Sequence, residues 1–318
     1  MRKLLTPNQA YTINYPEAIE LAEKQTSIFW TAEEVHVEKD VHSILTELTE
    51  AERHGVITTL KLFTQYELIV GNEYWKQVGD MFRHPADIQR MAATFSFFEL
   101  GVHGPFYSKI NEALGLANEE FYTEYLRDPV LADRINMLEG YADPDKPLEF
   151  LLALAFAEGV VLYSSFAFLK HFQSQGKNKI LNIVRGINFS VRDESLHCDA
   201  SCWLYRTLLD ELGIDPAVML ETAHKMAEVV REHEHAIVDK IFEKGGIEGI
   251  TAVQLKHFVD SRINLVLRQL GYNNLYDVKY NPILEWFDAG INAFSFNDFF
   301  SGQGREYSRD WSENDLSW

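Results

Sequence analysis

The chain has 318 residues, with 29 Lys and Arg against 48 Asp and Glu, and therefore a formal charge of −19 at pH 7. This acidic balance excludes a nucleic-acid-binding surface, because phosphates would be repelled, and no basic run offers a site for anionic lipid. Hydrophobic residues make up 46% and aromatic residues 13% of the sequence, which excludes a disordered chain and allows a large core.

Apolar residues recur at helical spacing through most of the sequence, and strand-like alternation is scarce. Prolines near the starts of these stretches and glycines near their ends fit helix boundaries. We therefore predict an all-α protein in which residues 1–300 form one domain. The expected helices cover residues 45–71, 86–113, 148–173, 178–211, 216–243 and 251–269.

Residues 148–169 form the one stretch that is long and apolar enough to cross a bilayer. Glu158 lies at its centre, however. A helix that is apolar on every side also occurs in the middle of a large helical bundle. We therefore predict a buried core helix and no membrane span.

The two cysteines, Cys198 and Cys202, lie one helical turn apart, which is a poor geometry for a disulfide and too few ligands for a zinc quartet. The N-terminal residues lack the apolar stretch of a secretory signal. Both observations favour a reduced, cytoplasmic, soluble protein.

Residues 301–318 are polar, rich in glycine and serine, and without a helical pattern, and yet they contain Tyr307, Trp311 and Trp318. A disordered terminus is one interpretation. Aromatic side chains are costly to leave in water, so we expect a flexible tail that docks on a partner protein.

Four glutamates interrupt apolar helical stretches, namely Glu67, Glu99, Glu158 and Glu194. An ionised carboxylate in such surroundings costs several kcal/mol unless it is neutralised, paired or bound to a metal. His103 follows Glu99 by four residues and His197 follows Glu194 by three, so each histidine shares a helix face with its glutamate.

Glu-x-x-His spacing alone is weak evidence for a metal site. It also occurs in polar stretches where we expect solvated surface, at Glu33/His36, Glu221/His224 and Glu232/His235. The buried set has an order instead: Glu, Glu plus His, Glu, and Glu plus His on four successive helices. This is the order of dinuclear carboxylate sites in ferritin-like bundles. Two divalent cations would balance four carboxylates, whereas the alternative is four separately satisfied core carboxylates.

The first pair departs from the usual spacing by one residue. Gly101, Gly104 and Pro105 surround it, and Pro105 lacks the amide hydrogen that a regular helix needs. We predict a local π-turn that absorbs the additional residue and keeps both Glu99 and His103 directed inward.

Much of the sequence resembles the small, radical-generating subunit of class I ribonucleotide reductase. The most specific stretch is RDESLH (192–197). The other similar stretches are EKQTSIFW (23–30), LKLFTQYE (60–67), HGPFY (103–107), AEGVVLYSSFAF (157–168), NPILEWFD (281–288) and FFSGQGREY (299–307). Plain ferritins and monooxygenases share the order of the ligands but not the tryptophan of the first stretch, the Arg-Asp-Glu run or the tail.

The resemblance implies a ferritin-like bundle that holds two metal ions, with iron favoured over manganese or a mixed pair, and that uses dioxygen as oxidant. The implied metal ligands are Glu67, Glu99, His103, Glu158, Glu194 and His197. Tyr107 would store the radical. Its alternative is a core tyrosine with an ordinary hydrogen bond.

The resemblance also implies a relay in which Asp193 links His103 to Trp30, and Tyr307 carries oxidation along the tail to a large catalytic subunit. A surface aspartate and ordinary core packing are the alternatives for Asp193 and Trp30. The chain would form a homodimer and act as the small subunit of ribonucleoside-diphosphate reductase, supplying the oxidant for deoxyribonucleotide synthesis on its partner. The competing interpretation is another ferritin-like dimetal oxidase or an iron-handling protein, which would need no tail.

Overall fold

Helices make up nearly all the regular structure of residues 3–287, the part of the chain that the computed structural model describes. Within this part no strand forms, and a single isolated β-bridge joins Ile247 to Ile250. The all-α prediction is confirmed. The expected tail, with Tyr307, Trp311 and Trp318, lies outside the described residues.

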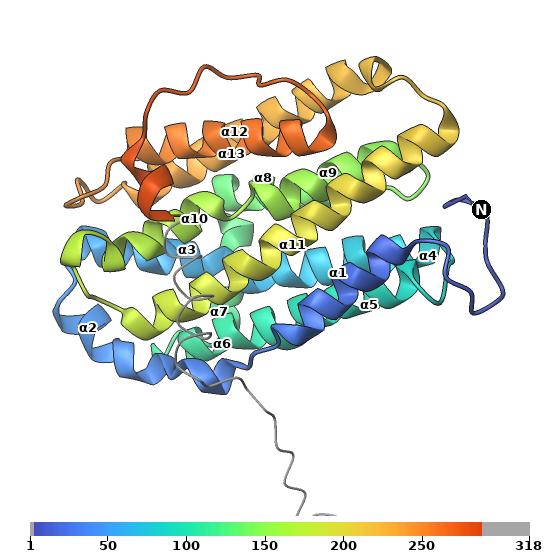
Figure 1. Ribbon diagram of the computed structural model, residues 1–318. Helices are drawn as coiled ribbons and strands as arrows, with labels where there is room; N and C mark the ends of the chain where they lie inside the picture. The colour runs from blue at the N-terminus through green and yellow to red at the C-terminus, as the bar shows by residue number, and fades with distance from the viewer. Residues whose placement is uncertain (1–2, 288–318) are drawn as a thin grey trace, which may run out of the picture.

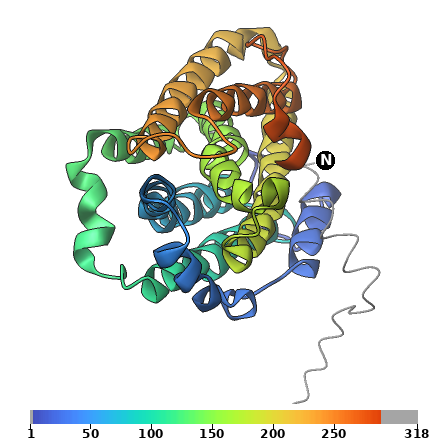
Figure 2. The ribbon, with the colours of Figure 1, turned by 90° about the vertical axis from the view of Figure 1, so that its left-hand side faces the viewer.

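Four helical rods form the centre of the bundle, which Figure 1 shows from the side and Figure 2 after a quarter turn. They are α3 (Glu50–Ile69), α5 (Ile88–Phe98) continued by α6 (Gly104–Ala113), α9 (Pro147–Gly159) followed by α10 (Tyr163–Lys170), and α11 (Leu181–Leu212). α11 packs along α9 and α10, and α3 packs against α6. This is the ferritin-like arrangement that the sequence predicted.

Further helices cover the four rods. α1 (Pro16–Ser27) packs on α5 and α11, while α12 (Leu220–Ile241) and α13 (Ala252–Leu270) pack on each other and on α9 and α10. The long connection from α6 to α9 contains α7 (Glu119–Thr123) and α8 (Pro129–Tyr141).

The first predicted helix is divided in the structure. α2 (Val41–Thr46) ends before Thr49, whose hydroxyl accepts the Glu52 amide while the Glu52 carboxylate accepts the Thr49 amide. This capping box starts a new helix at Glu50, after the predicted start at residue 45. α3 also continues beyond residue 71, through a π-helical segment (Val70–Trp75) into α4 (Lys76–Met81).

The stretch Pro147–Ser174 is long and apolar enough to cross a membrane, but the bundle completely buries its most apolar window of 18 residues. The predicted core position is therefore confirmed. The prediction of one continuous helix over 148–173 is wrong, because α9 ends at Gly159 and Leu162 adopts a left-handed conformation with φ of 73° before α10 begins.

Glu234 corrects the prediction that the charged stretch from Glu221 to His235 is a solvated surface. It is fully buried on α12, where it pairs with the buried Arg134 of α8 and accepts a hydrogen bond of 2.6 Å from the Ser164 hydroxyl. A pair across two helices leaves no trace in the local charge pattern, so the sequence could not separate this carboxylate from its exposed neighbours.

The buried His171, which directly follows α10, predicts a pH-dependent stability. Burial lowers the pKa of its imidazole to about 4, whereas the pKa in the unfolded chain is 6.5. The unfolded chain therefore binds more protons between these two values, and the folded state loses stability as the pH falls below 6.5. Between pH 7 and pH 5 we expect this histidine to remove about 2 kcal/mol from the free energy of unfolding.

Urea unfolding of the parent and of His171→Gln at both pH values checks this expectation. The parent should lose more stability than the variant on acidification, while His36→Gln, which alters an exposed histidine, should behave as the parent does. Equal losses in the parent and in His171→Gln would contradict it.

Candidate metal centre

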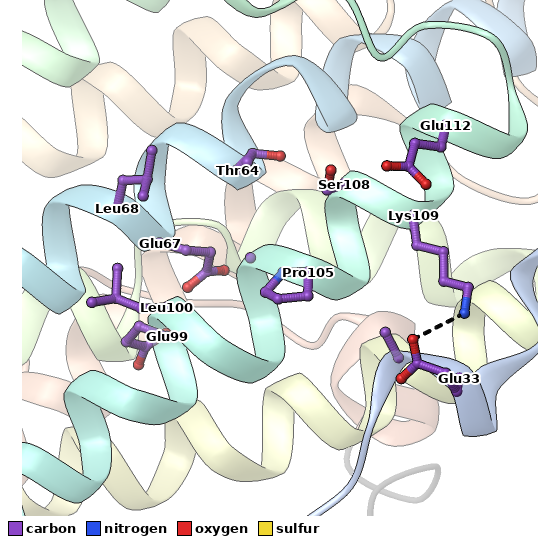
Figure 3. Close-up of a pocket in the computed structure, with 12 residues that line it drawn as sticks. Glu33, Thr64, Glu67, Leu68, Glu99, Leu100, Pro105, Ser108, Lys109 and Glu112 are labelled. Carbon is purple, nitrogen blue, oxygen red and sulfur yellow. Dashed lines mark hydrogen bonds and ion pairs between the residues drawn. The ribbon is translucent and has the colours of Figure 1, made fainter. Parts of the chain in front are cut away.

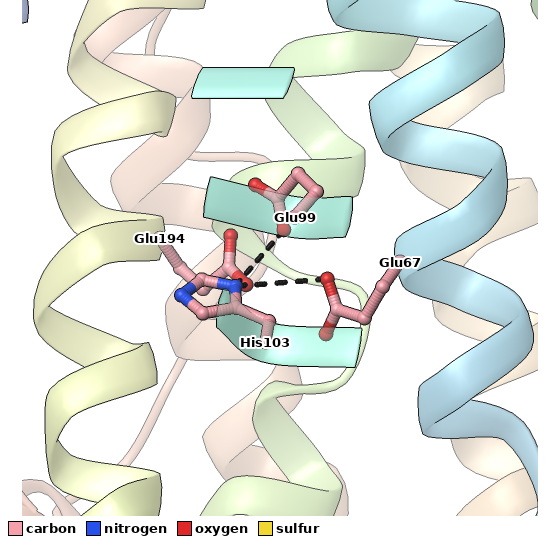
Figure 4. Close-up of side chains that lie close together, drawn as sticks. All are labelled: Glu67, Glu99, His103 and Glu194. Carbon is pink, nitrogen blue, oxygen red and sulfur yellow. Dashed lines mark hydrogen bonds and ion pairs between the residues drawn. The ribbon is translucent and has the colours of Figure 1, made fainter. Parts of the chain in front are cut away.

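The four central rods bring all six predicted metal ligands together, and none of the six residues is more than 2% exposed. Two groups can be drawn in which one ligand atom from each residue lies within 4.8 Å of all the others. The first group is Glu67, Glu99, His103 and Glu194, which Figure 4 shows, and the second is Glu99, Glu158, Glu194 and His197. Glu99 and Glu194 belong to both groups.

The two histidines mark two positions within the cluster. His103 Nδ1 lies 2.9 Å from Glu99 Oε2, 3.4 Å from Glu194 Oε1 and 3.7 Å from Glu67 Oε2. His197 Nδ1 lies 2.6 Å from Glu99 Oε1, 3.5 Å from Glu194 Oε2 and 3.6 Å from Glu158 Oε2. Glu99 and Glu194 each direct one carboxylate oxygen towards His103 and the other towards His197. This arrangement would allow two cations to share both carboxylates.

The predicted π-turn is confirmed, because Glu99–His103 forms a π-helical segment between α5 and α6. A π-turn holds one residue more than an α-turn, so side chains four positions apart can be directed to the same side. Both Glu99 and His103 are buried, whereas Gly101 between them is exposed.

The donor atoms of the cluster fit a pair of metal ions. Buried atoms that lack a hydrogen-bond partner in the described chain include both carboxylate oxygens of Glu67 and of Glu194, Glu99 Oε1, Glu158 Oε2 and His197 Nδ1. Buried polar atoms seldom lack partners in folded proteins. Carboxylate oxygens with imidazole nitrogens are ligands that suit iron and manganese.

Without metals, the directions of the pKa shifts in this cluster favour a charge balance provided by protons. Burial and the neighbouring carboxylates raise the pKa of Glu67 and of Glu158 well above the usual value. Burial opposes the charged form of Glu99 too, but His103 and His197 hold its pKa well below the usual value. Burial likewise opposes charge on both histidines, yet the charge of Glu99 raises their pKa values. These directions favour the neutral forms of Glu67 and Glu158 and the charged forms of Glu99 and of both histidines, so bound protons offset the negative charge of the cluster.

Asp193 lies next to this cluster and is fully buried, so the alternative of a surface aspartate is wrong. Its Oδ2 accepts a hydrogen bond of 2.7 Å from the Trp30 indole and lies 3.2 Å from His103 Nε2. His103 can therefore direct Nε2–H to Asp193 and keep Nδ1 free for a metal, the usual arrangement for a histidine ligand.

Tyr107 follows the π-turn and is fully buried. Its hydroxyl donates to Ser190 Oγ at 3.2 Å, and its ring lies 4.5 Å from that of Phe63. Burial raises the pKa of Tyr107 well above its usual value.

Trp75 contacts the cluster, which the sequence did not predict. It lies in the π-helical segment after α3, and its indole N–H donates to Glu158 Oε1. Its ring packs edge-on against Phe95, with a centroid distance of 4.7 Å. Because the helix was expected to end at residue 71, nothing in the sequence directed this tryptophan towards the cluster.

A surface pocket of about 570 Å³ lies between α3 and α6, and Glu67 and Glu99 form part of its inner wall (Figure 3). Glu33 and Lys109 form an ion pair of 3.3 Å at this pocket. The Glu-x-x-His pairs that we assigned to the surface are not part of the cluster, and Glu33, Glu221 and Glu232 are exposed.

Metal loading should therefore release protons. Two divalent cations carry the charge of four protons, so we expect about four protons to leave the cluster per two ions bound at pH 7, and the affinity to fall as the pH is lowered. Calorimetric titration of the metal-free protein in buffers of different ionisation enthalpy counts these protons. A variant at an exposed carboxylate, Glu221→Gln, should release the same number, and a release near zero would contradict the proposed proton balance.

Comparison with known proteins agrees with this geometry. The family model described as ribonucleotide reductase, small chain, matches residues 7–282. A probable ribonucleoside-diphosphate reductase small subunit from Invertebrate iridescent virus 3 is 28% identical, over 96% of this chain and 85% of the viral protein.

Two solved structures share the fold. The ribonucleotide reductase R2 subunit from Clostridium botulinum has a TM-score of 0.77 and 17% identity, covering 91% of this chain and 94% of its own. The dimanganese(II)-NrdF from Streptococcus sanguinis has a TM-score of 0.73 and 19% identity, covering 90% and 99%. Since the family model spans most of the sequence, the chain belongs to the ribonucleotide reductase small-chain family.

Proposed function

We propose that this small subunit binds two metal ions, uses them with dioxygen to oxidise Tyr107, and passes the stored oxidising equivalent to a large catalytic subunit that reduces ribonucleotides. The observation that carries the proposal is the pair of four-residue groups that share Glu99 and Glu194. The hydrogen-bonded chain from Trp30 through Asp193 to His103 supports the transfer step.

Each metal position has its own terminal ligands. Glu67 and His103 would hold the first ion, Glu158 and His197 the second, and Glu99 and Glu194 would bridge the two. We favour iron, with a manganese pair or a mixed pair as alternatives, because these ions accept the same oxygen and imidazole ligands.

Bound metals would supply the reduction of dioxygen and the withdrawal of one electron from a nearby side chain. Tyr107 suits this task because its phenol is buried and its proton has a neighbouring hydroxyl, Ser190, as hydrogen-bond partner. Phe63 and Phe106 pack against the ring and exclude water, which protects an oxidised tyrosine from reduction.

Trp30 and Asp193 would connect the centre to the outside. Trp30 is 1% exposed, and α11 holds its segment in place, because Arg192 donates a hydrogen bond of 2.7 Å to the Ile28 carbonyl. Tyr307 would continue the transfer along residues 301–318 to the large subunit, which holds the substrate.

We also propose a homodimer, formed at the apolar surface beside the pocket. Leu68 on α3 is 44% exposed and Phe97 on α5 is 53% exposed. Leu68 and Leu100 both line the pocket (Figure 3). Large apolar side chains grouped in this way are typical of protein interfaces.

Residues 3–287 contain one stretch apolar and long enough to span a membrane, and its enclosed position supports a soluble protein. We place this protein in the cytoplasm.

The role of Tyr107 predicts a spectroscopic difference. After loading with ferrous iron and exposure to dioxygen, the parent should give the electron paramagnetic resonance signal of a tyrosyl radical, and Tyr107→Phe should not. Both proteins should contain the same amount of metal. A radical signal that survives in Tyr107→Phe would contradict the assignment, and protein that binds no metal would contradict the proposed centre.

The role of the tail predicts a separation of two activities. Deletion of residues 301–318 should abolish ribonucleotide reduction with a large subunit, while metal content and dioxygen consumption persist. Tyr307→Phe in the intact tail is the matched variant, and it should lose reduction without losing binding to the large subunit. Reduction that survives the deletion would favour the competing ferritin-like oxidase.

A further inference from the structure

The third ligand-bearing rod is interrupted one residue after its ligand, Glu158. The amides of Val160 and Val161 both donate to the Phe156 carbonyl, at 3.0 and 3.1 Å, and the helical ladder ends there. Leu162 then takes a positive φ of 73°, which is unusual for a buried leucine. Glu158 is therefore in the last turn of α9, where the backbone needs support from outside the helix.

Arg262 of α13 supplies that support. Its Nε–H donates to the Gly159 carbonyl at 3.0 Å, and its guanidinium lies 3.8 Å from the centroid of the Tyr163 ring at the start of α10. The side chain is buried, and it forms no ion pair with a carboxylate of the described chain. One guanidinium thus contacts both sides of the interruption.

Tyr163 also contacts the fourth ligand-bearing rod, α11. The Tyr163 hydroxyl lies 3.3 Å from the Ser195 hydroxyl, and Ser195 directly follows Glu194 on α11. Gly159 also permits the close approach of these helices, because a Cβ atom there would lie 2.3 Å from Val266 Cγ2 and 2.6 Å from Cys198 Sγ. The interruption is therefore enclosed by α11 and α13.

We propose that Arg262 is a positioning residue that fixes the end of α9, so that Glu158 is held at the second metal position. This inference rests on the metal centre proposed above. Arg262 is not a ligand itself, because a guanidinium is a cation without an acceptor atom, and it contacts only the Gly159 carbonyl and the Tyr163 ring at the interruption. Its loss should weaken the position formed by Glu158 and His197 and leave the position formed by Glu67 and His103 unchanged.

Manganese(II) titration of the metal-free protein tests the inference, with free ion followed by electron paramagnetic resonance. Glu67→Gln and Glu158→Gln first identify which step of the isotherm belongs to which position. Arg262→Met, which keeps the length of the side chain, should weaken the Glu158 step about 10- to 100-fold, as is usual for groups that orient a ligand. Arg262→Lys can still donate to the Gly159 carbonyl and should restore part of this affinity.

Arg231→Met is the matched control, because Arg231 also stacks on a tyrosine, Tyr276, at 4.7 Å, but pairs with Asp260 on the outer helices. It should bind metal as the parent does. An Arg262→Met isotherm equal to that of the parent, or one in which both steps weaken equally, would overturn the inference. A parent that binds fewer than two ions would instead overturn the proposed centre.

Discussion

The cost of burying four carboxylates in one apolar interior constrains this molecule more than any other interaction. Glu67, Glu99, Glu158 and Glu194 come from four rods and meet in the buried centre of the bundle. Such a group of like charges is unstable unless positive charge enters with it. Either metal ions or protons can provide that charge, and the directions of the pKa shifts in the cluster describe the proton-balanced form.

Two ligand-bearing rods depart from regular helix where they carry their ligands. The second rod forms a π-turn between Glu99 and His103, and the third stops one residue after Glu158. A regular helix fixes the direction of each side chain through its period, so local distortion is one way to direct an additional ligand inward. Other elements contact the second of these distortions. Arg262 of α13 donates to the Gly159 carbonyl, and Trp75, in the segment after α3, donates to Glu158.

The sequence predicted the fold and the cluster because both depend on patterns that are local along the chain. Glutamates within apolar stretches and histidines one turn later can be recognised in the sequence alone. The glycines and the proline around His103 likewise predicted the π-turn. The interruption at Gly159 was not visible, since the side chains that pack closely on it, Val266 and Cys198, come from other helices. The same reason hid the contact of Trp75 with Glu158 and the burial of Glu234. The roles of Tyr107, Trp30 and the tail rest on family resemblance and remain predictions.

The proton-balanced form of the cluster bears on the order in which the chain folds and binds metal. If protons neutralise the same carboxylates that would hold the cations, the interior would reach its folded shape before any metal binds. Under the proposed function, synthesis of the subunit and its oxidation would then be separate events. A cell could accumulate the finished but inert polypeptide and make it oxidising only when metal and dioxygen arrive together.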